Sequence, residues 1–264
     1  MDFATLIGII LGIVAIGVGM VLKGVSISAL ANPAAFLIII VGTIASVTIA
    51  FPMSELKRVP KLFVILFKEK KMTNTTELVR LFSDLAQLAR KEGLLALESK
   101  LNEVDDPFLR NGLSLAVDGQ NADYIRDVLT EEIEAMEERH QAGASIFTQA
   151  GTYAPTLGVL GAVIGLVAAL GNMSDTVALG HAISAAFIAT LLGIFTGYVL
   201  WHPFANKLKR KSRLEAQHKY MMIEGVLSIL EGEAPRVIEQ KLVSYLPAGE
   251  RKKFLEEGSV RMDE

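Results

Sequence analysis

The sequence predicts an all-α membrane protein with four transmembrane helices and a helical cytoplasmic domain. Four apolar segments free of Asp, Glu, Lys and Arg lie at about 3–22, 33–51, 153–173 and 178–201. Each is close to the roughly 20 residues that a helix needs to cross a bilayer. The basic residues are also segregated, because Lys23 alone among the 26 Lys and Arg residues falls in a segment assigned to the outer side.

Composition supports a membrane protein with substantial polar parts. Hydrophobic residues make up 51% of the 264 residues and the mean hydropathy is +0.41, yet the formal net charge is only -3 and charged residues are plentiful. This combination is too apolar for an ordinary soluble domain. The chain has no cysteine. Disulfides, thiolate metal sites and cysteine nucleophiles are therefore excluded, which suits a reducing compartment.

The first segment, 3–22, is predicted to be a transmembrane helix rather than a cleaved signal peptide. Asp2 stands where a signal peptide has basic residues, and the apolar run is longer than a usual signal core. Basic clusters at 57–71 and 207–213 follow the second and fourth segments. Because cytoplasmic loops retain Lys and Arg, both clusters and both termini are expected in the cytoplasm of a bacterial cell. Two short external loops, about 23–32 and 174–177, complete this topology.

A cytoplasmic helical domain is predicted at 52–152, between the second and third spans. Apolar residues recur at helical spacing over 74–101 and predict one amphipathic helix there. A second helix is expected from Pro107 to the Asp118-Gly119 pair. A third begins at Ala122 and is expected to run directly into the third span, since no proline intervenes before Pro155.

The C-terminal segment, 202–264, is also expected to lie in the cytoplasm as helices. An amphipathic helix is predicted around 221–230, and a shorter one follows Pro235. These boundaries divide the chain into spans at 1–51, a helical domain at 52–152, spans at 153–201 and C-terminal helices.

Small residues line the third and fourth spans every three or four positions, which predicts close helix packing in lipid. A bundle of several copies would use stripes on both spans. In the third span the stripe is Gly151, Ala154, Gly158, Gly161, Gly165 and Ala168, and in the fourth it is Ala182, Ala186, Ala189, Gly193 and Gly197.

No span contains a charged residue, so the chain by itself lacks the acid that usually marks an ion path. The polar atoms at depth are hydroxyls, among them Thr43 in the second span and Thr190 in the fourth. Thr190 shares its stripe with Gly193 and Gly197 and is expected to point along the packed face. The alternative is a hydrogen bond from its hydroxyl to the preceding helical turn.

Four runs of the sequence are distinctive when taken together: GTYAPTLG beginning at Gly151, the run 185–193, HPF at 202–204 and LARKEGLLALE at 88–98. In their joint order they resemble the MotA family of flagellar motor stator subunits, and most closely members from Bacillus-type bacteria. The resemblance covers essentially the whole chain, including the order of two spans, a long loop and two spans.

The resemblance implies a homopentameric ring around two copies of the single-span partner MotB, whose aspartate carries the ion. It further implies that Pro155 and Pro203 couple ion passage to motion and that Thr190 is the channel threonine. Physical chemistry offers plainer alternatives for the prolines: Pro155 could start a helix, and Pro203 could end its span.

The position that carries a second threonine in sodium-driven members is Ala162 in this sequence. A methyl group cannot coordinate Na⁺, which prefers oxygen ligands. We therefore expect H⁺ to be the translocated ion, with Na⁺ as the alternative, and we expect no cofactor or metal.

The family's force-generating charges match Arg90 and Glu98, expected to share one cytoplasmic helix with Gly93 between them and to face the rotor protein FliG. An exposed ion pair contributes about 0.2 to 1 kcal/mol, which suits a contact made and released at each step. The alternative is that both are solvated surface charges. Lys91 and Glu92 are close alternatives that periodicity does not separate from these two.

Two other function classes remain open. An ExbB- or TolQ-like energiser of envelope proteins shares the ion-driven architecture, but it has one span followed by a pair rather than four. A structural membrane scaffold would give Thr190 and Pro155 only packing roles. A substrate transporter is disfavoured, because nothing at the midplane of the spans could bind a solute. No nucleic-acid partner and no enzyme activity are expected, because the sequence lacks a phosphate loop, a paired nucleophile and metal spacing among His140, His181, His202 and His218.

Overall fold

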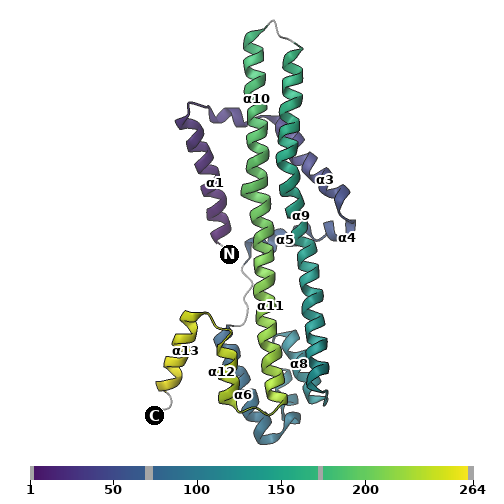
Figure 1. Ribbon diagram of the computed structural model, residues 1–264, viewed down its shortest axis with the longest axis vertical. Helices are drawn as coiled ribbons and strands as arrows, with labels where there is room; N and C mark the ends of the chain where they lie inside the picture. Colours follow the sequence, from purple (N-terminus) through teal and green to yellow (C-terminus); the bar gives the residue numbers. More distant parts are fainter. Residues whose placement is uncertain (1–2, 69–73, 172–174, 261–264) are drawn as a thin grey trace. The chain divides into compact units, whose positions relative to one another are not determined.

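The computed structural model describes residues 3–68, 74–171 and 175–260, with side chains up to residue 254, and every regular element there is helical (Figure 1). Packing divides the chain into two compact units. The apolar unit comprises Met1–Lys70 and Arg139–Lys211, and the polar unit comprises Lys71–Glu138 and Ser212–Glu264. Lys70, Lys71 and the predicted end of the third span at Met173 lie outside the described residues.

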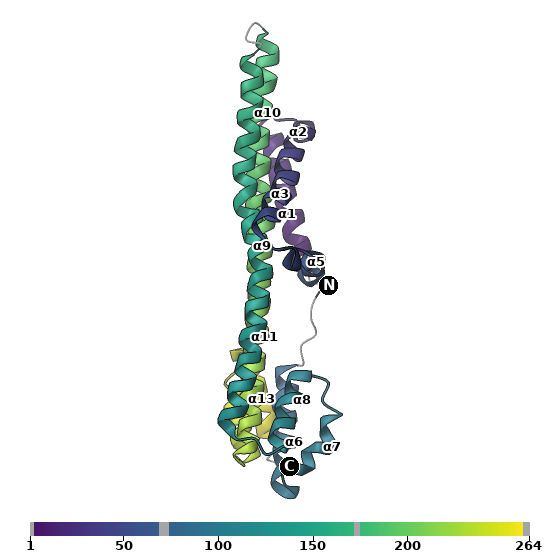
Figure 2. The ribbon, with the colours of Figure 1, turned by 90° about the vertical axis from the view of Figure 1, so that its right-hand side faces the viewer.

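The four predicted spans correspond to four helices that are long and apolar enough to cross a membrane. They are Phe3–Leu22, Pro33–Ala50, and parts of the long helical stretches Ala122–Leu170 and Thr176–Leu230. Figures 1 and 2 both show α1 and α3 beside the paired helices α9 and α10. Elements with residues in the apolar unit are α1 (Phe3–Leu22), η1 (Ile27–Leu30), α2 (Pro33–Phe36), η2 (Leu37–Val41), α3 (Gly42–Ala50), α4 (Met53–Leu56), α5 (Val59–Phe67), α9 (Ala122–Leu170), α10 (Thr176–Phe195), η4 (Thr196–Trp201) and α11 (His202–Leu230).

Helices α9 and α11 extend well past the apolar segments. The 49 residues of α9 include Pro155, so the expected run from Ala122 into the third span is confirmed. The fourth span likewise continues through η4 into α11, and the helix predicted around 221–230 is its end. Division by packing therefore differs from division by hydropathy. The unit that contains the spans also includes polar residues after the second span, residues from Arg139 before the third span, and residues up to Lys211 after the fourth.

The polar unit surrounds one core of large apolar side chains, including Phe82, Leu129, Ile133 and Met221. Its helices begin at side-chain caps where the sequence offers them, since the Asp106 carboxylate accepts from two backbone N–H groups at the start of α8. Its elements are α6 (Thr75–Glu92), η3 (Leu94–Leu97), α7 (Glu98–Leu101), α8 (Pro107–Val117), α12 (Pro235–Val243), α13 (Ala248–Val260) and the portions of α9 and α11 assigned to this unit.

The single helix predicted over 74–101 is wrong. Helix α6 ends at Glu92, and Gly93 adopts φ of 88°, in the left-handed region that favours glycine. The chain then turns through η3, which buries Leu97 completely in the core. The break lets the apolar residues after Gly93 reach the core from a new direction, which a straight helix could not do.

Candidate functional site

The third and fourth spans approach so closely that their glycines face backbone atoms. A Cβ atom added to Gly158 would lie 2.9 Å from both the Ala189 carbonyl oxygen and Gly193 Cα. One added to Gly193 would lie 2.8 Å from the Ala154 carbonyl oxygen. A side chain at either glycine would force the two backbones apart. The packing role predicted for the two stripes is confirmed within a single chain.

Pro155 lies inside α9 and its ring contacts the fourth span. Proline has no N–H, so the carbonyl of Gly151 lacks its usual helical partner. Both groups face Gly197, where an added Cβ atom would lie 2.7 Å from Pro155 Cγ and 2.8 Å from the Gly151 oxygen. The alternative of Pro155 as a helix start is wrong, because α9 begins at Ala122.

Thr190 and Ala162 are half-buried on α10 and α9. The Thr190 hydroxyl donates to the Ala186 carbonyl oxygen at 3.3 Å, so the hydrogen bond to the preceding turn is present. An oxygen lone pair on that hydroxyl remains available to accept a further hydrogen bond.

The two residues also share one side of the helix pair. Ala162 directly follows Gly161, and Thr190 directly follows Ala189, whose Cβ would lie 3.5 Å from a Cβ on Gly161. The helices are antiparallel, because later residues of α9 meet earlier residues of α10. A step of about 100° along each helix rotates both residues to the same side of the contact. The pattern therefore places Thr190 and Ala162 where one pathway could pass both.

Two buried polar atoms in the apolar unit have no hydrogen-bond partner among the described residues, Thr43 Oγ1 and Trp201 Nε1. Thr43 is 2% exposed and lies one helical turn from Ile39 and one from Val47. Trp201 packs against two clusters of buried apolar residues, one containing Ile39 and the other containing Val47. The sequence placed Thr43 at depth, but no pattern indicated that the clusters containing Ile39 and Val47 also involve Trp201, which is far away in the chain.

Pro203 is exposed at the second position of α11. Pro203 does not end the helix, because helix continues from η4 into α11. Its neighbour His202 packs on Gly151, where an added Cβ atom would lie 2.8 Å from the imidazole ring. The HPF run therefore forms a junction between α9 and the end of the fourth span.

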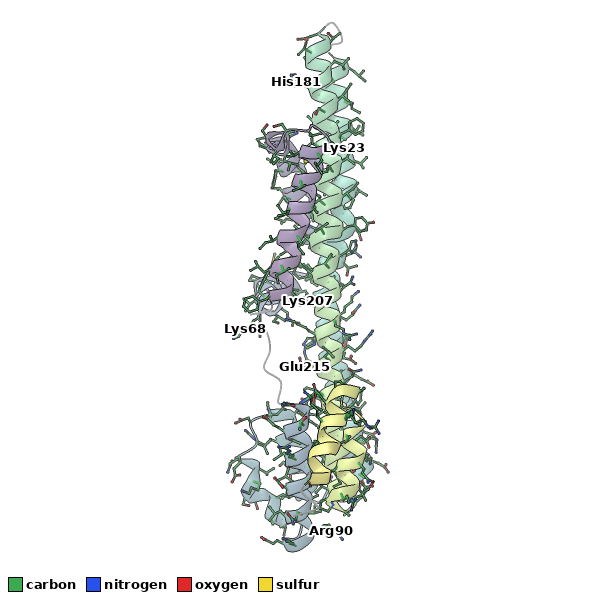
Figure 3. All side chains as sticks on the ribbon, turned by 90° about the vertical axis from the view of Figure 1, so that its left-hand side faces the viewer. Lys23, Lys68, Arg90, His181, Lys207 and Glu215 are labelled. Atoms are coloured by element: carbon green, nitrogen blue, oxygen red, sulfur yellow. The ribbon has the colours of Figure 1, made fainter. Side chains whose placement is uncertain are left out.

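Arg90 and Glu98 are both exposed in the polar unit, but they do not share one helix. Arg90 is in the last turn of α6, as Figure 3 shows, and Glu98 begins α7 after the break at Gly93. Among the described residues neither forms an ion pair with another side chain. Between them Leu95 is 72% exposed. The two charges thus flank the turn at Gly93 rather than lying along a helix face.

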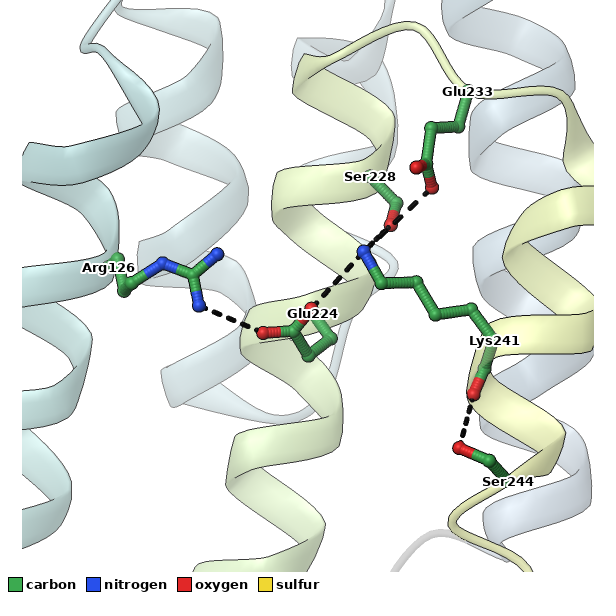
Figure 4. Close-up of polar contacts among 6 residues, drawn as sticks. All are labelled: Arg126, Glu224, Ser228, Glu233, Lys241 and Ser244. Atoms are coloured by element: carbon green, nitrogen blue, oxygen red, sulfur yellow. Dashed lines mark hydrogen bonds and ion pairs between the residues drawn. The ribbon is translucent and has the colours of Figure 1, made fainter.

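A polar network that the sequence did not indicate connects three helices of the polar unit (Figure 4). Glu224 on α11 accepts from Arg126 on α9 at 3.0 Å and lies 3.2 Å from Lys241 on α12. Lys241 Nζ also donates to the hydroxyl of Ser228, a fully buried residue, at 3.1 Å. The pKa of nearby Tyr245 is raised from its usual value, first by burial and then by the charge of Glu224. Within the described residues no cluster of His, Asp and Glu could hold a metal ion.

This chain is similar to known proteins along its whole length. Residues 6–93 match the motility protein A N-terminal family, and residues 100–221 match the MotA/TolQ/ExbB proton channel family. Motility protein A of Bacillus subtilis (strain 168) is 70% identical over 264 residues, covering 100% of this chain and 98% of the relative.

Two solved structures share the fold. The flagellar MotAB stator complex from Bacillus subtilis matches with a TM-score of 0.92 and 72% identity, over 96% of this chain and 99% of the other. MotAB of C. jejuni matches with a TM-score of 0.89 and 32% identity, over 94% and 97%. With this similarity over both the spans and the polar segments, the chain belongs to the MotA/TolQ/ExbB proton channel family, in its motility protein A branch.

Proposed function

We propose that this chain is a flagellar motor stator subunit that forms a proton channel with MotB and converts ion flow into torque on the rotor. The observation that carries the proposal is its match to the MotAB stator complex over nearly the full length of both chains. The lack of any acid inside the four spans fits this role, because the ion-carrying aspartate then belongs to the partner.

The proposed arrangement is a ring of five copies around two MotB chains in the bacterial cytoplasmic membrane, with both termini in the cytoplasm. A proton binds the MotB aspartate from the external side, passes a narrow gap lined by Thr190 and Ala162, and leaves near Pro155. One unit charge crossing the membrane releases about 2.3 kcal/mol per 100 mV. Neutralising the carboxylate removes the cost of a charge in a low-dielectric gap, so the partner helix can advance to the next copy.

Torque reaches the rotor protein FliG through the turn that carries Arg90 and Glu98 in this proposal. The turn is held by buried Leu97, while both charges and Leu95 are exposed. Exposed charges interact weakly and are screened beyond about 10 Å at moderate salt, which allows contacts to be made and broken at each step. Pro203, at the junction beside His202, is positioned to pass motion from the fourth span into α11.

Thr190→Val tests the ion pathway. We expect swimming speed and proton flux to fall several-fold, because the hydroxyl's free lone pair is lost while side-chain volume is kept. The matched control is Thr48→Val, whose hydroxyl donates to Ile44 at 2.7 Å on an exposed face of α3. Unchanged motility and flux in the Thr190 variant would remove this residue from the pathway.

Reversing both rotor-facing charges, with Arg90→Glu and Glu98→Arg together, tests the torque contact. Swimming torque should drop while membrane assembly and the mass of the purified complex remain normal, because neither charge has a partner among the described residues. Normal motility would contradict the assignment.

Two further measurements test the ring and the ion. A mass of the purified complex corresponding to five copies of this chain with two of MotB would support the ring. Swimming that requires external Na⁺ at a fixed proton gradient would favour the sodium alternative.

A further inference from the structure

Helix α5 lies where the ends of several spans come together in the apolar unit. Its Phe63 ring is 6.5 Å from the ring of Trp201, the last residue of η4. Lys211 Nζ donates to the carbonyls of Ile65 at 2.6 Å and Lys68 at 2.9 Å at the end of α5. Figures 1 and 2 show α5 beside the N-terminal end of α1.

Two further contacts fix the level of α5 relative to the spans. Lys207, just past the fourth span, donates to the hydroxyl of Thr5 near the start of α1. Helix α3 ends at Ala50, and α4 and α5 follow it directly. In Figure 3 Lys207 and Lys68 lie toward one end of α1 and Lys23 toward the other. Helix α5 therefore lies at one membrane–water boundary, where Trp201 is also a typical interfacial residue.

The helix is amphipathic, and part of its apolar surface is not covered by any residue that the structure describes. Leu66 is fully buried and Phe63 packs edge to face on Phe147, with ring centroids 5.2 Å apart. On the other side Val64 is 58% exposed and Ile65 is 37% exposed. These two side chains extend the apolar surface of the spans into the boundary region.

The exposed charges at the described positions around this apolar surface are all positive. Lys57, Arg58, Lys61 and Lys68 are exposed, and their side chains have no ion pair among the described residues. Glu55 is the only acid at described positions from 51 to 68, and it is half-buried. A helix with apolar residues on one side and a basic margin has the character of an interfacial element that prefers anionic lipid.

We propose that α5 and its basic margin form a docking surface for anionic phospholipid headgroups, with Val64 and Ile65 inserted at the acyl-chain boundary of the adjoining leaflet. A second copy of this unit is the competing occupant, but its charges do not match. The acids among the described residues of the apolar unit are Glu55 and Asp175, and Asp175 precedes α10, remote from the boundary at Trp201. Phosphate headgroups supply the missing negative charge. This inference is independent of ion conduction.

Because the chain has no cysteine, a Val64→Cys variant gives it a single site for a fluorescent label. The labelled full chain is purified together with its partner subunit. The labelled complex is reconstituted in vesicles of phosphatidylcholine and phosphatidylglycerol in equal amounts, with a spin-labelled quencher on one lipid or the other. We expect quenching by labelled phosphatidylglycerol to exceed that by labelled phosphatidylcholine at least about twofold at low salt, and the ratio to fall as salt rises.

Combining Lys57→Gln, Arg58→Gln and Lys61→Gln should bring the quenching ratio close to one. Arg236→Gln, Arg251→Gln and Lys253→Gln on α12 and α13 remove the same charge and should leave the ratio unchanged. Equal quenching by the two lipids in the parent complex would overturn the proposal. A label protected from both quenchers would also overturn it and identify a protein, such as a second copy, as the cover. If the triple variant fails to assemble, the salt dependence of the quenching ratio in the parent complex tests the proposal instead, and a ratio that does not fall as salt rises would contradict it.

Discussion

The two units of this chain are packed at their glycines in different ways. A Cβ atom on Gly193 in the apolar unit would meet backbone, 2.8 Å from the Ala154 carbonyl oxygen. One on Gly225 in the polar unit would meet a side chain, 2.5 Å from the Phe82 ring. In lipid there is no hydrophobic drive between helices, so close backbone approach provides the attraction, whereas the polar unit closes around large apolar side chains. Substitutions should therefore be tolerated differently in the two units.

Buried hydroxyls show the same contrast. Ser228 in the polar unit accepts a hydrogen bond from Lys241 within a network that spans three helices. Thr43 in the apolar unit is nearly as buried but has no partner among the described residues. The polar unit satisfies the Ser228 oxygen with a charged side chain, whereas the spans have no charge and satisfy the buried Thr196 hydroxyl through backbone carbonyls of its own helix.

The largest loss of stability is expected for Gly193→Ala, and it should exceed the loss for Gly225→Ala. The new methyl at Gly193 overlaps backbone on α9, so the helices must separate and we expect loss of most of the folded, membrane-inserted protein. The methyl at Gly225 displaces one ring, and a cost of about 1 to 3 kcal/mol is typical of such overpacking. Yield and thermal unfolding of the purified full chain measure both.

Gly180→Ala is the control for these variants, because a Cβ atom there would have nothing within 4 Å. It should behave like the parent protein. Equal stability losses for Gly193→Ala and Gly225→Ala would show that backbone contact between the spans is no more restrictive than side-chain contact in the polar unit.

The glycine pairs also show how far the sequence predicts the fold and site. Hydropathy and charge segregation predict four spans, because a bilayer imposes length and excludes charge. Spacing predicts that the glycine stripes pack, but not that Gly158 faces Gly193, since any other span could supply the partner surface. The break at Gly93 escapes periodicity, because apolar residues on both sides of it face one core from two directions.

The polar network could not be predicted for a related reason. Arg126, Glu224 and Lys241 lie on three helices, and sequence spacing reports neighbours only within one helix. The family resemblance indicates Thr190 and Ala162 as pathway residues, and helical geometry places them on one side of the α9–α10 pair. The orientation of these residues thus follows from the packed glycines, whereas their role in ion passage stays a prediction.

Lys241→Met should lower the stability of the polar unit by an intermediate amount. It leaves the buried Ser228 hydroxyl without its partner and Glu224 with Arg126 alone, which we expect to cost about 1 to 3 kcal/mol of unfolding free energy. Amide hydrogen exchange in α12 and the end of α11 should accelerate accordingly. Lys100→Met is the matched control, because its pair with Glu103 is exposed on both sides and contributes about 0 to 1 kcal/mol. Equal exchange in the two variants would mean that the network does not hold α12.

Thr43→Val should change stability least, and any change should be an increase rather than a loss. Replacing a buried hydroxyl that has no partner by a methyl of similar size removes a desolvation penalty, so stability should be unchanged or rise by up to about 1 kcal/mol. The control is Thr196→Val, because the Thr196 hydroxyl donates to the Leu192 carbonyl at 2.9 Å and its loss should lower the unfolding temperature slightly. Thermal unfolding of the full chain in detergent compares the two. A larger loss at Thr43 than at Thr196 would mean that a group outside this chain bonds the Thr43 hydroxyl in the assembled protein. The contrast between Thr43 and Ser228 would then disappear, since both hydroxyls would have a partner.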